Sequence, residues 1–427
     1  MINIENILNT LSQHNIFLTG GAGVGKTTIT NQIIKSYEEE GKKVLKLAST
    51  GLAATLINGQ TIHSFFDFGI ANNIEELQRN KKLEIPRKVK KILQNIELII
   101  IDEISMVSDK LFEMLRLRLL QADYTNKLMV VGDFLQLPPI SKHGVFFAFE
   151  SSSWEKFNFK TVLLKKVYRT QDERFIHLLH AIRYGEFSEN IKVDLESFIK
   201  PLPQDLREFT FLFGKNNSAN LHNQYQLNFI QTPLHVKEAE VMIHDKKVKD
   251  KEIEKYFEDA KIEKYLHVKV GAPVLFVRNA WNYYNGERGI ITKIEEKCLH
   301  VKKTNGITIK LMPQKQSKTQ WKEITKNGQK EYEEIELFSI YQYPIKLAFA
   351  ITIHKSQGMS LDDVIIETNE IFTPSQFYVA LSRIKNPSRL ILIQPRKHWK
   401  NLIYVHKKAV DFYKILEDSV ESSTEKK

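Results

Sequence analysis

The chain has 427 residues, of which 42% are hydrophobic, and its 62 basic and 51 acidic side chains give a formal charge of +11. This length supports more than one hydrophobic core, and the basic balance suits a polyanionic partner such as nucleic acid. The single cysteine, Cys298, excludes an internal disulfide and a metal site built from cysteines. No apolar run reaches the roughly 20 residues of a membrane span, and the start carries Glu5 without an apolar leader, so we expect a cytoplasmic protein with no membrane partner.

A phosphate-binding pattern stands between the first predicted strand, 15–19, and a predicted helix over 29–35. Residues 20–28 read GGAGVGKTT, which contains the full G-x-x-x-x-G-K-[ST] pattern of a loop that cradles nucleotide phosphates. We expect Lys26 to reach the β- and γ-phosphates and Thr27 to coordinate Mg²⁺. Within this loop, the other predicted nucleotide contacts are Gly21, Gly23, Gly25 and Thr28. The chain is therefore predicted to bind a nucleoside triphosphate.

Apolar, β-rich runs continue along the chain and alternate with helix-like segments. They lie at 43–48, 98–101, 128–131, 209–213, 345–353, 364–367 and 389–393. This alternation predicts an α/β protein with parallel sheets wrapped by helices. The second of these runs ends in Asp102 and Glu103, at the edge where open α/β sheets bind ligands. Asp102 is expected to hold Mg²⁺ and Glu103 to activate the attacking water, so the pair indicates an ATPase.

Two segments interrupt this alternation. Residues 67–91 concentrate basic side chains around Pro86, which indicates either an interaction surface or a solvated helical hairpin without a partner. In the second half, the charged, helix-like segment 238–264 precedes a group of short β-like runs, which predicts a small inserted β-barrel. The runs are 273–277, 289–294, 299–303, 307–311 and 334–340, separated by turn signals such as Asn285-Gly286, Asn305-Gly306 and Asn327-Gly328. The polar tail 417–427 lacks apolar periodicity and is expected to be disordered.

Longer motifs connect these elements to a known family. Within the segment after the run at 128–131, Gln136 is well placed to sense the γ-phosphate. Taken in order over about residues 15–395, eight motifs resemble those of the Pif1 family of superfamily 1B DNA helicases. They are ASTGLAA from Ala48, GQTIHSF from Gly59, DEISMVS from Asp102, GDFLQLPP from Gly132, LKKVYRT from Leu164, YNGERG from Tyr284, AITIHKSQGMSLDDV from Ala350 and FYVALSR from Phe377.

The resemblance implies two RecA-like lobes, each with a parallel sheet, together with a small helical insertion in the first lobe and an SH3-like β-barrel in the second. The implied domains are lobe 1A over 1–64 and 89–160, insertion 1B over 65–88 as a candidate wedge, lobe 2A over 161–236 and 342–416, and inserted domain 2B over 237–341.

The resemblance also assigns roles to individual side chains. Arg169 and Arg383 are expected to be arginine fingers that reach the γ-phosphate from the second lobe when the lobes close, and Gly358 is expected beside the nucleotide. The adenine-reading glutamine of the family is missing, because Asn3 lies near its expected position. Adenine selectivity is therefore not carried over.

The same motifs predict the residues that bind a single DNA strand through its backbone, which gives affinity without sequence preference. They are Thr50, His63, Ser64, Pro138, Thr352, His354, Lys355 and Ser356, with Arg278 before the insert as a further candidate. Phe65 and Phe134 either stack on bases or belong to the core.

By resemblance, the function is that of an ATP-dependent DNA helicase that uses ATP and Mg²⁺, moves 5′ to 3′ on single-stranded DNA and works as a monomer when free. The implied substrates are 5′-tailed or forked duplexes, with G-quadruplexes and RNA–DNA hybrids added by analogy. Two alternatives stay open. One is a RecD-like helicase subunit beside a nuclease, and the other is an ATP-switched DNA clamp that does not step.

Overall fold

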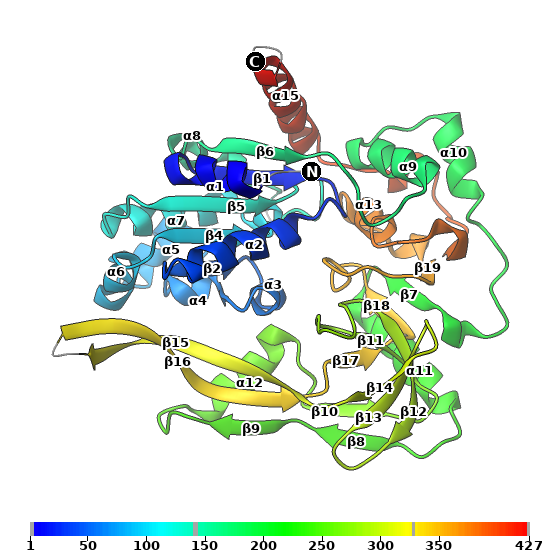
Figure 1. Ribbon diagram of the computed structural model, residues 1–427. Coiled ribbons are helices and arrows are strands. Elements are labelled where there is room, and N and C mark those ends of the chain that lie inside the picture. Colours follow the sequence, from blue (N-terminus) through cyan, green and yellow to red (C-terminus); the bar gives the residue numbers. More distant parts are fainter. Residues whose placement is uncertain (1–3, 140–143, 327–328, 425–427) are drawn as a thin grey trace.

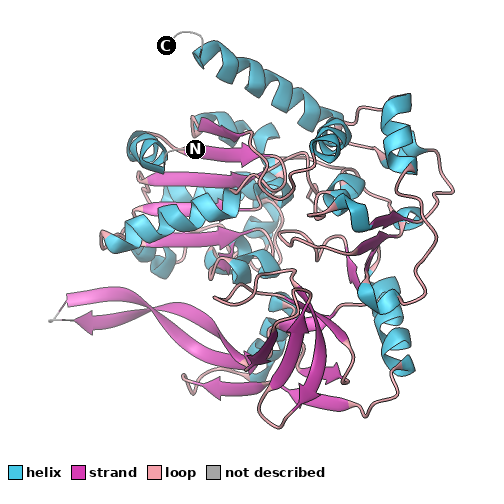
Figure 2. Cartoon of the chain, turned by 45° about the vertical axis from the view of Figure 1, so that its right-hand side comes forward, coloured by secondary structure: helices cyan, strands magenta, loops and turns pink. Residues whose placement is uncertain are grey.

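The computed structural model describes residues 4–139, 144–326 and 329–424. Two α/β lobes lie side by side, and an antiparallel, β-rich domain extends from the second lobe beneath the first (Figure 1). Figure 2 shows the long hairpin of this domain reaching out under the first lobe. Among the described residues, no helix is both long and apolar enough to cross a membrane.

The first lobe is built around a six-stranded sheet with the order β3-β2-β4-β5-β1-β6, in which every neighbouring pair is parallel. The strands are β1 (Ile16–Gly20), β2 (Val44–Ala48), β3 (Gln60–Thr61), β4 (Leu98–Asp102), β5 (Lys127–Gly132) and β6 (Lys160–Leu164). The central strands are continuous apolar runs because helices cover both faces of the sheet. All carboxyl ends of parallel strands share one edge, so the loops after β1, β4 and β5 meet there.

The helices of the first lobe include the predicted insertion. They are α1 (Ile4–Gln13), α2 (Lys26–Glu39), α3 (Gly51–Leu56), α4 (Ile62–Phe65), α5 (Ile74–Arg79), α6 (Arg87–Leu93), α7 (Asp109–Gln121) and α8 (Ser152–Lys156). The insertion forms α5, capped by the Asn73 side chain, and α6, which follows Pro86. Leu77, Val89 and Ile92 pack into the core of the lobe. The basic residues of α6 stay partly or fully exposed on its outer side.

The boundary predicted at residue 161 between the lobes is wrong. The run from Lys160 to Leu164 is β6, and it pairs in parallel with β1 from Ile16↔Lys160 to Gly20↔Leu164. The chain therefore crosses to the second lobe only after β6. Sequence reasoning missed this because strand pairing between distant segments is a tertiary contact that leaves no local signal.

The second lobe has a four-stranded parallel sheet with the order β18-β7-β19-β20. Its strands are β7 (Thr210–Phe213), β18 (Ala350–Thr352), β19 (Val364–Ile366) and β20 (Leu390–Leu392), and its helices are α9 (Glu173–Tyr184), α10 (Glu189–Glu196), α11 (Asn216–Phe229), α13 (Gln376–Leu381) and α14 (Trp399–Leu402). All four strands lie within apolar runs that the sequence predicted. The expectation of two parallel-sheet lobes is confirmed.

The insert of the second lobe is antiparallel, as expected. One sheet has the order β14-β13-β12-β11-β17, a ribbon has the order β15-β16-β9, and β8 pairs with β10. The elements are β8 (His235–Glu238), β9 (Glu240–Ile243), α12 (Asp250–Ala260), β10 (Tyr265–Val268), β11 (Pro273–Phe276), β12 (Arg288–Ile294), β13 (Leu299–Lys303), β14 (Thr308–Leu311), β15 (Gln314–Lys326), β16 (Gln329–Gln342) and β17 (Ile345–Leu347). The polar strand β15 was not predicted, because pairing with β16 along its whole length stabilises it, and such pairing leaves no apolar pattern in β15 itself. The predicted turn at Asn327-Gly328 lies outside the described residues.

The expectation of a disordered tail from residue 417 is also wrong for the described part of that tail. The last helix, α15 (Lys407–Thr424), continues through it and packs on the first lobe, although residues up to 416 were assigned to the second. Ala409, Tyr413 and Leu416 are buried in the core of the first lobe, and Glu417 accepts a hydrogen bond from the Tyr184 hydroxyl at 2.5 Å. One apolar stripe of the helix packs on the first lobe, and its polar C-terminal end therefore shows no apolar periodicity in the sequence.

Candidate active site

The phosphate-binding loop connects β1 to α2 through a backbone shape that requires glycine. Gly23 (φ +77°) and Gly25 (φ +88°) have left-handed conformations, and Gly25 is the N-cap of α2. A Cβ atom on Gly23 would lie 2.6 Å from the Cβ atom of Arg169. Lys26 Nζ donates to the carbonyl oxygens of Gly20 and Gly21, each at 2.8 Å. The loop thus brings a cation and a helix N-terminus to one point, which suits a phosphate.

The two carboxylates predicted at the end of β4 lie beside this loop. Burial lowers the pKa of Lys26 to about 8, although the charges of Asp133 and Glu103 raise it. Burial and the neighbouring Asp102 charge raise the pKa of Glu103 to about 7. A carboxyl group whose pKa is near neutrality is suited to take a proton from water.

The donors for a divalent cation are hard oxygen atoms, which is the ligand class that Mg²⁺ prefers. Asp102 Oδ1 accepts a hydrogen bond from the Glu103 backbone N–H at 2.8 Å, and this bond orients the carboxylate. The Thr27 side chain is exposed at the start of α2. The chemistry of this donor set therefore fits the predicted Mg²⁺ ligands.

Two arginines, Arg383 buried and Arg169 partly buried, approach the same centre from different segments. Arg169 donates from Nε to Ser360 Oγ at 2.9 Å, and Arg383 donates from Nε to the Val379 carbonyl at 3.0 Å. Burial, and next the Arg383 charge, lower the pKa of Arg169 to about 9, while the Arg383 charge also lowers the pKa of Glu103. Two neighbouring cations that are poorly solvated favour an anion close to both. The predicted pair is brought together, but Arg169 comes from the connection between β6 and α9 and not from the body of the second lobe.

Arg183 on α9 is a candidate functional residue that sequence reasoning missed. Its Nη2 lies 3.0 Å from Asp133 Oδ1 and its Nε lies 3.2 Å from Asp133 Oδ2, and both side chains are buried. Asp133 follows β5 in the first lobe, whereas α9 packs in the core of the second. The ion pair therefore joins the lobes. The charge of Asp133 raises the pKa of Lys26, and the charge of Arg183 lowers it. The sequence signal that could have indicated this role is a single arginine within the largely apolar helical run IHLLHAIRY.

Two tyrosines from the C-terminal third of the chain contact the segments that carry the phosphate-binding loop and the end of β5. The Tyr378 hydroxyl accepts a hydrogen bond from the Ala22 backbone N–H at 2.9 Å, and burial raises the pKa of Tyr378 to about 12, so it stays neutral. The Tyr413 hydroxyl bonds Thr19 Oγ1 and accepts from the Phe134 N–H at 3.3 Å. The Arg183 guanidinium lies 4.8 Å from the centre of the Tyr413 ring. The helix α15 is thus attached directly behind the phosphate-binding loop.

Gln357 connects the catalytic carboxylate to the second lobe, and the sequence prediction also missed it. Its Nε2 donates to Glu103 Oε2 at 2.9 Å. The predicted Gly358 (φ +78°) follows in the same turn, which continues to Ser360, the partner of Arg169. Gln136 remains close to this centre, with Nε2 at 3.4 Å from Asp133 Oδ2.

A cleft of about 660 Å³ lies between the lobes on the other side of Glu103. Its wall contains several of the residues predicted to bind a strand, namely Thr50, Pro138, Thr352, His354 and Lys355. Glu103 and Gln357 also line it. Burial lowers the pKa of His354, which is therefore neutral and able both to donate and to accept hydrogen bonds. We call this space the strand cleft.

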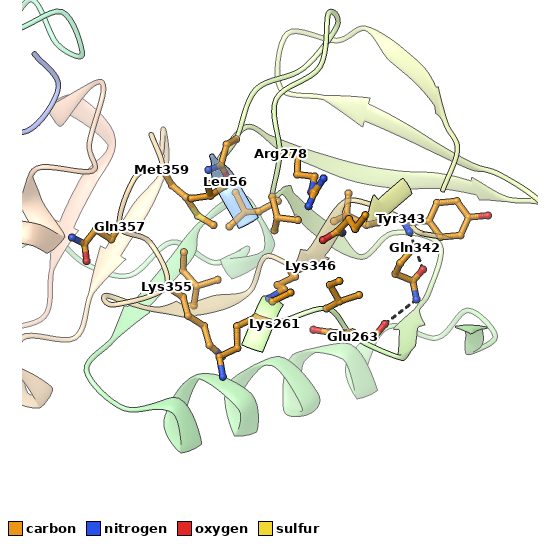
Figure 3. A pocket seen from close by; sticks show the side chains of 18 residues that line it. Leu56, Lys261, Glu263, Arg278, Gln342, Tyr343, Lys346, Lys355, Gln357 and Met359 are labelled. Carbon is orange, nitrogen blue, oxygen red and sulfur yellow. Dashed lines mark hydrogen bonds between the residues drawn. The ribbon is translucent and has the colours of Figure 1, made fainter. Parts of the chain in front are cut away.

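A basic pocket adjoins the strand cleft through Lys261, Lys355 and Gln357, which line both (Figure 3). Figure 3 shows Arg278, Lys346, Lys355 and Lys261 arranged around it, with Glu263 on one side. Burial lowers the pKa of Lys346 to about 8 and also lowers the pKa of Arg278. Crowded, poorly solvated cations of this kind suit the phosphates of a nucleic-acid backbone.

His63 and Ser64 occupy a different cavity from the other predicted strand contacts. They line a space of about 380 Å³ between the first lobe, α12 and the β15–β16 hairpin. Phe65 is buried in the core of the first lobe. It also lines a neighbouring cavity that residues of the β15–β16 hairpin cover. The structure therefore does not bring these three residues to the strand cleft.

Two of the candidate strand contacts are buried in this structure, and for Phe134 the alternative of a core residue holds. Phe134 is 1% exposed, and its ring packs against Phe17, Trp154 and Phe412. It belongs to the core because α15 covers the end of β5. Ser356 is fully buried and its hydroxyl donates to the Ile353 carbonyl at 2.7 Å, so it stabilises the turn. Asn3, expected near the adenine, lies outside the described residues.

Comparisons with known proteins agree with this geometry. Residues 2–192 match the model of the PIF1-like helicase family, and residues 322–407 match a helicase model. The ATP-dependent DNA helicase Pif1 of Campylobacter jejuni is 40% identical over 435 residues, covering 96% of each chain. The crystal structure of Bacteroides sp Pif1 in complex with ADP-AlF4 superposes with a TM-score of 0.83 at 28% identity, covering 98% of this chain and 97% of that one. Bacteroides Pif1 bound to ssDNA gives a TM-score of 0.65 at 28% identity, covering 97% and 96%. The chain therefore belongs to the PIF1-like helicase family.

Proposed function

We propose that this chain, an ATP-dependent DNA helicase, moves 5′ to 3′ along single-stranded DNA and separates the duplex ahead of it. Its family membership supports ATP use and helicase activity. The direction of movement rests on the resemblance of its motifs to those of the Pif1 family. Binding of a single strand is supported by the related Bacteroides Pif1 bound to ssDNA.

The nucleotide site supplies each group that hydrolysis needs. Lys26 and the N-terminus of α2 bind the phosphates, and Thr27 and Asp102 would hold Mg²⁺, which would offset charge on the phosphate oxygens. Glu103 orients the attacking water and accepts its proton. Arg169 and Arg383 stabilise the charge of the transferred group.

One observation carries the coupling between hydrolysis and DNA. Glu103 belongs to the nucleotide site and also lines the strand cleft, and its carboxylate is bonded to Gln357 from the second lobe. A strand in the cleft therefore touches the turn that positions the catalytic carboxylate. ATP closes the lobes around Arg169 and Arg383, hydrolysis releases them, and the contacts to the strand alternate between the lobes.

The strand follows the cleft from Thr50, His354 and Lys355 toward the basic pocket at Lys346 and Arg278. Insertion 1B and the β15–β16 hairpin lie together at the edge of the first lobe, where Lys91 on α6 approaches Glu323 at 3.3 Å. We assign duplex separation to this edge. The substrates are 5′-tailed or forked duplexes and G-quadruplexes, and the protein acts as a monomer in the cytoplasm.

A complete hydrolytic set favours a motor over an ATP-switched clamp, because a clamp has little need for Glu103, Arg169 and Arg383 together. The test is strand separation by the purified chain alone on duplexes with either a 5′ or a 3′ single-stranded tail. The proposal expects ATP-dependent unwinding of the 5′-tailed duplex and none with Glu103→Gln. Unwinding of only the 3′-tailed duplex would overturn the direction, and unwinding of neither would favour the clamp or a partner-dependent subunit.

A further inference from the structure

Three potential metal ligands of different types meet on the hairpin of β12 and β13, in the insert of the second lobe. Cys298 Sγ lies 3.0 Å from Glu295 Oε2 and 3.8 Å from His300 Nε2, and His300 Nε2 lies 3.2 Å from Glu295 Oε1. One ligand atom from each residue lies within 4.8 Å of the other two. Ligands of a tetrahedral zinc ion are typically about 3.5 Å apart, given metal–ligand bonds of about 2.0–2.3 Å. The three atoms are therefore already close to the spacing of one coordination sphere.

The hairpin holds these side chains in a fixed arrangement. The Glu295 backbone N–H donates to the Cys298 carbonyl at 2.9 Å, which closes the turn. Cys298 and His300 are two residues apart, so an extended chain places them on one face. Lys237 from β8 donates to the carbonyl oxygens of Glu295 and Glu296, at 2.5 and 2.8 Å. The backbone that carries the ligands is thus anchored from a second segment.

The surroundings suit a small site that is closed on one side and open on the other. Cys298 is 2% exposed, while the alternate residues Leu299 and Val301 point into the core of the insert. The side chains of His300 and Glu295 are partly exposed. The thiol is therefore shielded, while a water molecule can reach the fourth position.

We propose that Glu295, Cys298 and His300 form a zinc(II) site with a water molecule as the fourth ligand. Thiolate, imidazole and carboxylate together are a ligand set for zinc and unsuited to Mg²⁺ or Ca²⁺. On binding, the Cys298 thiol releases its proton to solvent, and the thiolate and the carboxylate offset the two charges of the ion. The single cysteine of the sequence excludes sites built from several cysteines, and this mixed site needs only one.

One cation already contacts the carboxylate. Lys293 Nζ lies 2.6 Å from Glu295 Oε1, but its side chain is 64% exposed and can turn into solvent when a metal ion takes its place.

The test is a titration of the full, untagged chain with cobalt(II), which stands in for zinc and reports its ligands by absorption. The expected result is one equivalent of cobalt with a thiolate-to-metal charge-transfer band and the strong visible absorption of a tetrahedral ion, both removed by added zinc. Because Cys298 is the only cysteine, a thiolate band can arise from no other residue. Cys298→Ser and His300→Ala should each abolish the band.

A matched control is His267→Ala on β10, an exposed histidine of the same insert whose Nδ1 lies 3.1 Å from the Tyr265 carbonyl oxygen. This variant should keep the full band. Circular dichroism and DNA-stimulated ATP hydrolysis of all three variants report whether they fold. The proposal is overturned if the folded wild-type chain gives no thiolate band, or if zinc binds equally well to wild type, Cys298→Ser and His300→Ala. These outcomes do not depend on the direction of unwinding.

Discussion

The nucleotide site and the strand cleft share Glu103 but are built in opposite ways. In the nucleotide site the charged groups are buried or partly buried and held by close partners, with Asp133 held by Arg183, and Arg383 held by the Val379 carbonyl of α13. The strand cleft is a wide space of about 660 Å³ between the lobes, where polar side chains such as Thr50, His354 and Lys355 stand among apolar ones such as Leu56 and Met106. Charged groups packed against one another favour one reaction geometry, whereas an open cleft that contacts a strand through its backbone accepts any base sequence.

The largest effect is expected when an arginine finger is removed from the nucleotide site. Arg383→Ala should lower ATP turnover by about 10³- to 10⁵-fold, because the transition-state charge loses its buried cation. Nucleotide binding should persist, since Lys26 and α2 remain. Steady-state hydrolysis and binding of a fluorescent ATP analogue measure both quantities. A matched control is Arg389→Ala, a partly exposed arginine of the same lobe paired with Asp363 and Glu208. If both variants lost turnover equally, the assigned role of Arg383 would be wrong.

The second effect concerns the buried ion pair between the lobes. Arg183→Met leaves the Asp133 carboxylate buried without its partner, which typically costs about 3–5 kcal/mol of stability. The exposed pairs of Arg389 should contribute at most about 1 kcal/mol. Thermal unfolding of Arg183→Met and Arg389→Ala compares them. Equal midpoints for the two variants and the wild type would contradict the assignment of this pair as the joint between the lobes.

A smaller effect is expected in the strand cleft. Lys355→Ala should weaken binding of single-stranded DNA and reduce the slope of log affinity against log salt by about 0.7, the value for one phosphate contact to a single strand. Fluorescence anisotropy with a labelled oligonucleotide at several salt concentrations measures this slope. Lys35→Ala, on the exposed face of α2, is the control and should leave the slope unchanged. A loss of affinity with an unchanged slope would mean that Lys355 does not contact a phosphate.

The pH dependence of hydrolysis tests the electrostatics of the nucleotide site. The pKa of Glu103 is raised to about 7, so this base is protonated and inactive below that pH. The pKa of Lys26 is lowered to about 8, so its charge is lost above that pH. The kcat/KM for ATP in the presence of DNA should therefore follow a narrow bell between these limits, since this parameter reports the groups of the free enzyme. A flat profile from pH 6 to pH 9 would contradict these assignments.

The sequence predicts the catalytic edge well because the relevant signals are local. A glycine-rich turn before a helix, or an apolar strand that ends in two carboxylates, carries its structural context with it. Lys26, Asp102 and Glu103 accordingly meet in the structure, and Arg169 and Arg383, which the resemblance to the Pif1 family implied, lie close to them. The predicted strands of both lobes and most of those in the insert are present for the same reason.

What the sequence did not predict depends on contacts between distant segments. The run ending at Leu164 joins the first sheet because β1 has an open edge, and Tyr413 reaches Thr19 only after α15 has folded back on the first lobe. Phe134 was a candidate for base stacking until that helix covered it. Arg183 and Gln357 matter through the partners they meet across the lobe boundary, and neither residue type marks such a role in a single sequence.

The most direct test of the link between the two sites is the stimulation of ATP hydrolysis by single-stranded DNA in the wild type and in Gln357→Ala. This substitution removes the 2.9 Å hydrogen bond to Glu103 and leaves the arginine fingers and the phosphate-binding loop in place. With anisotropy used to ensure that both proteins are saturated with DNA, the account predicts strong stimulation in the wild type and little in the variant. Full stimulation of Gln357→Ala would show that DNA reaches the catalytic carboxylate by another route.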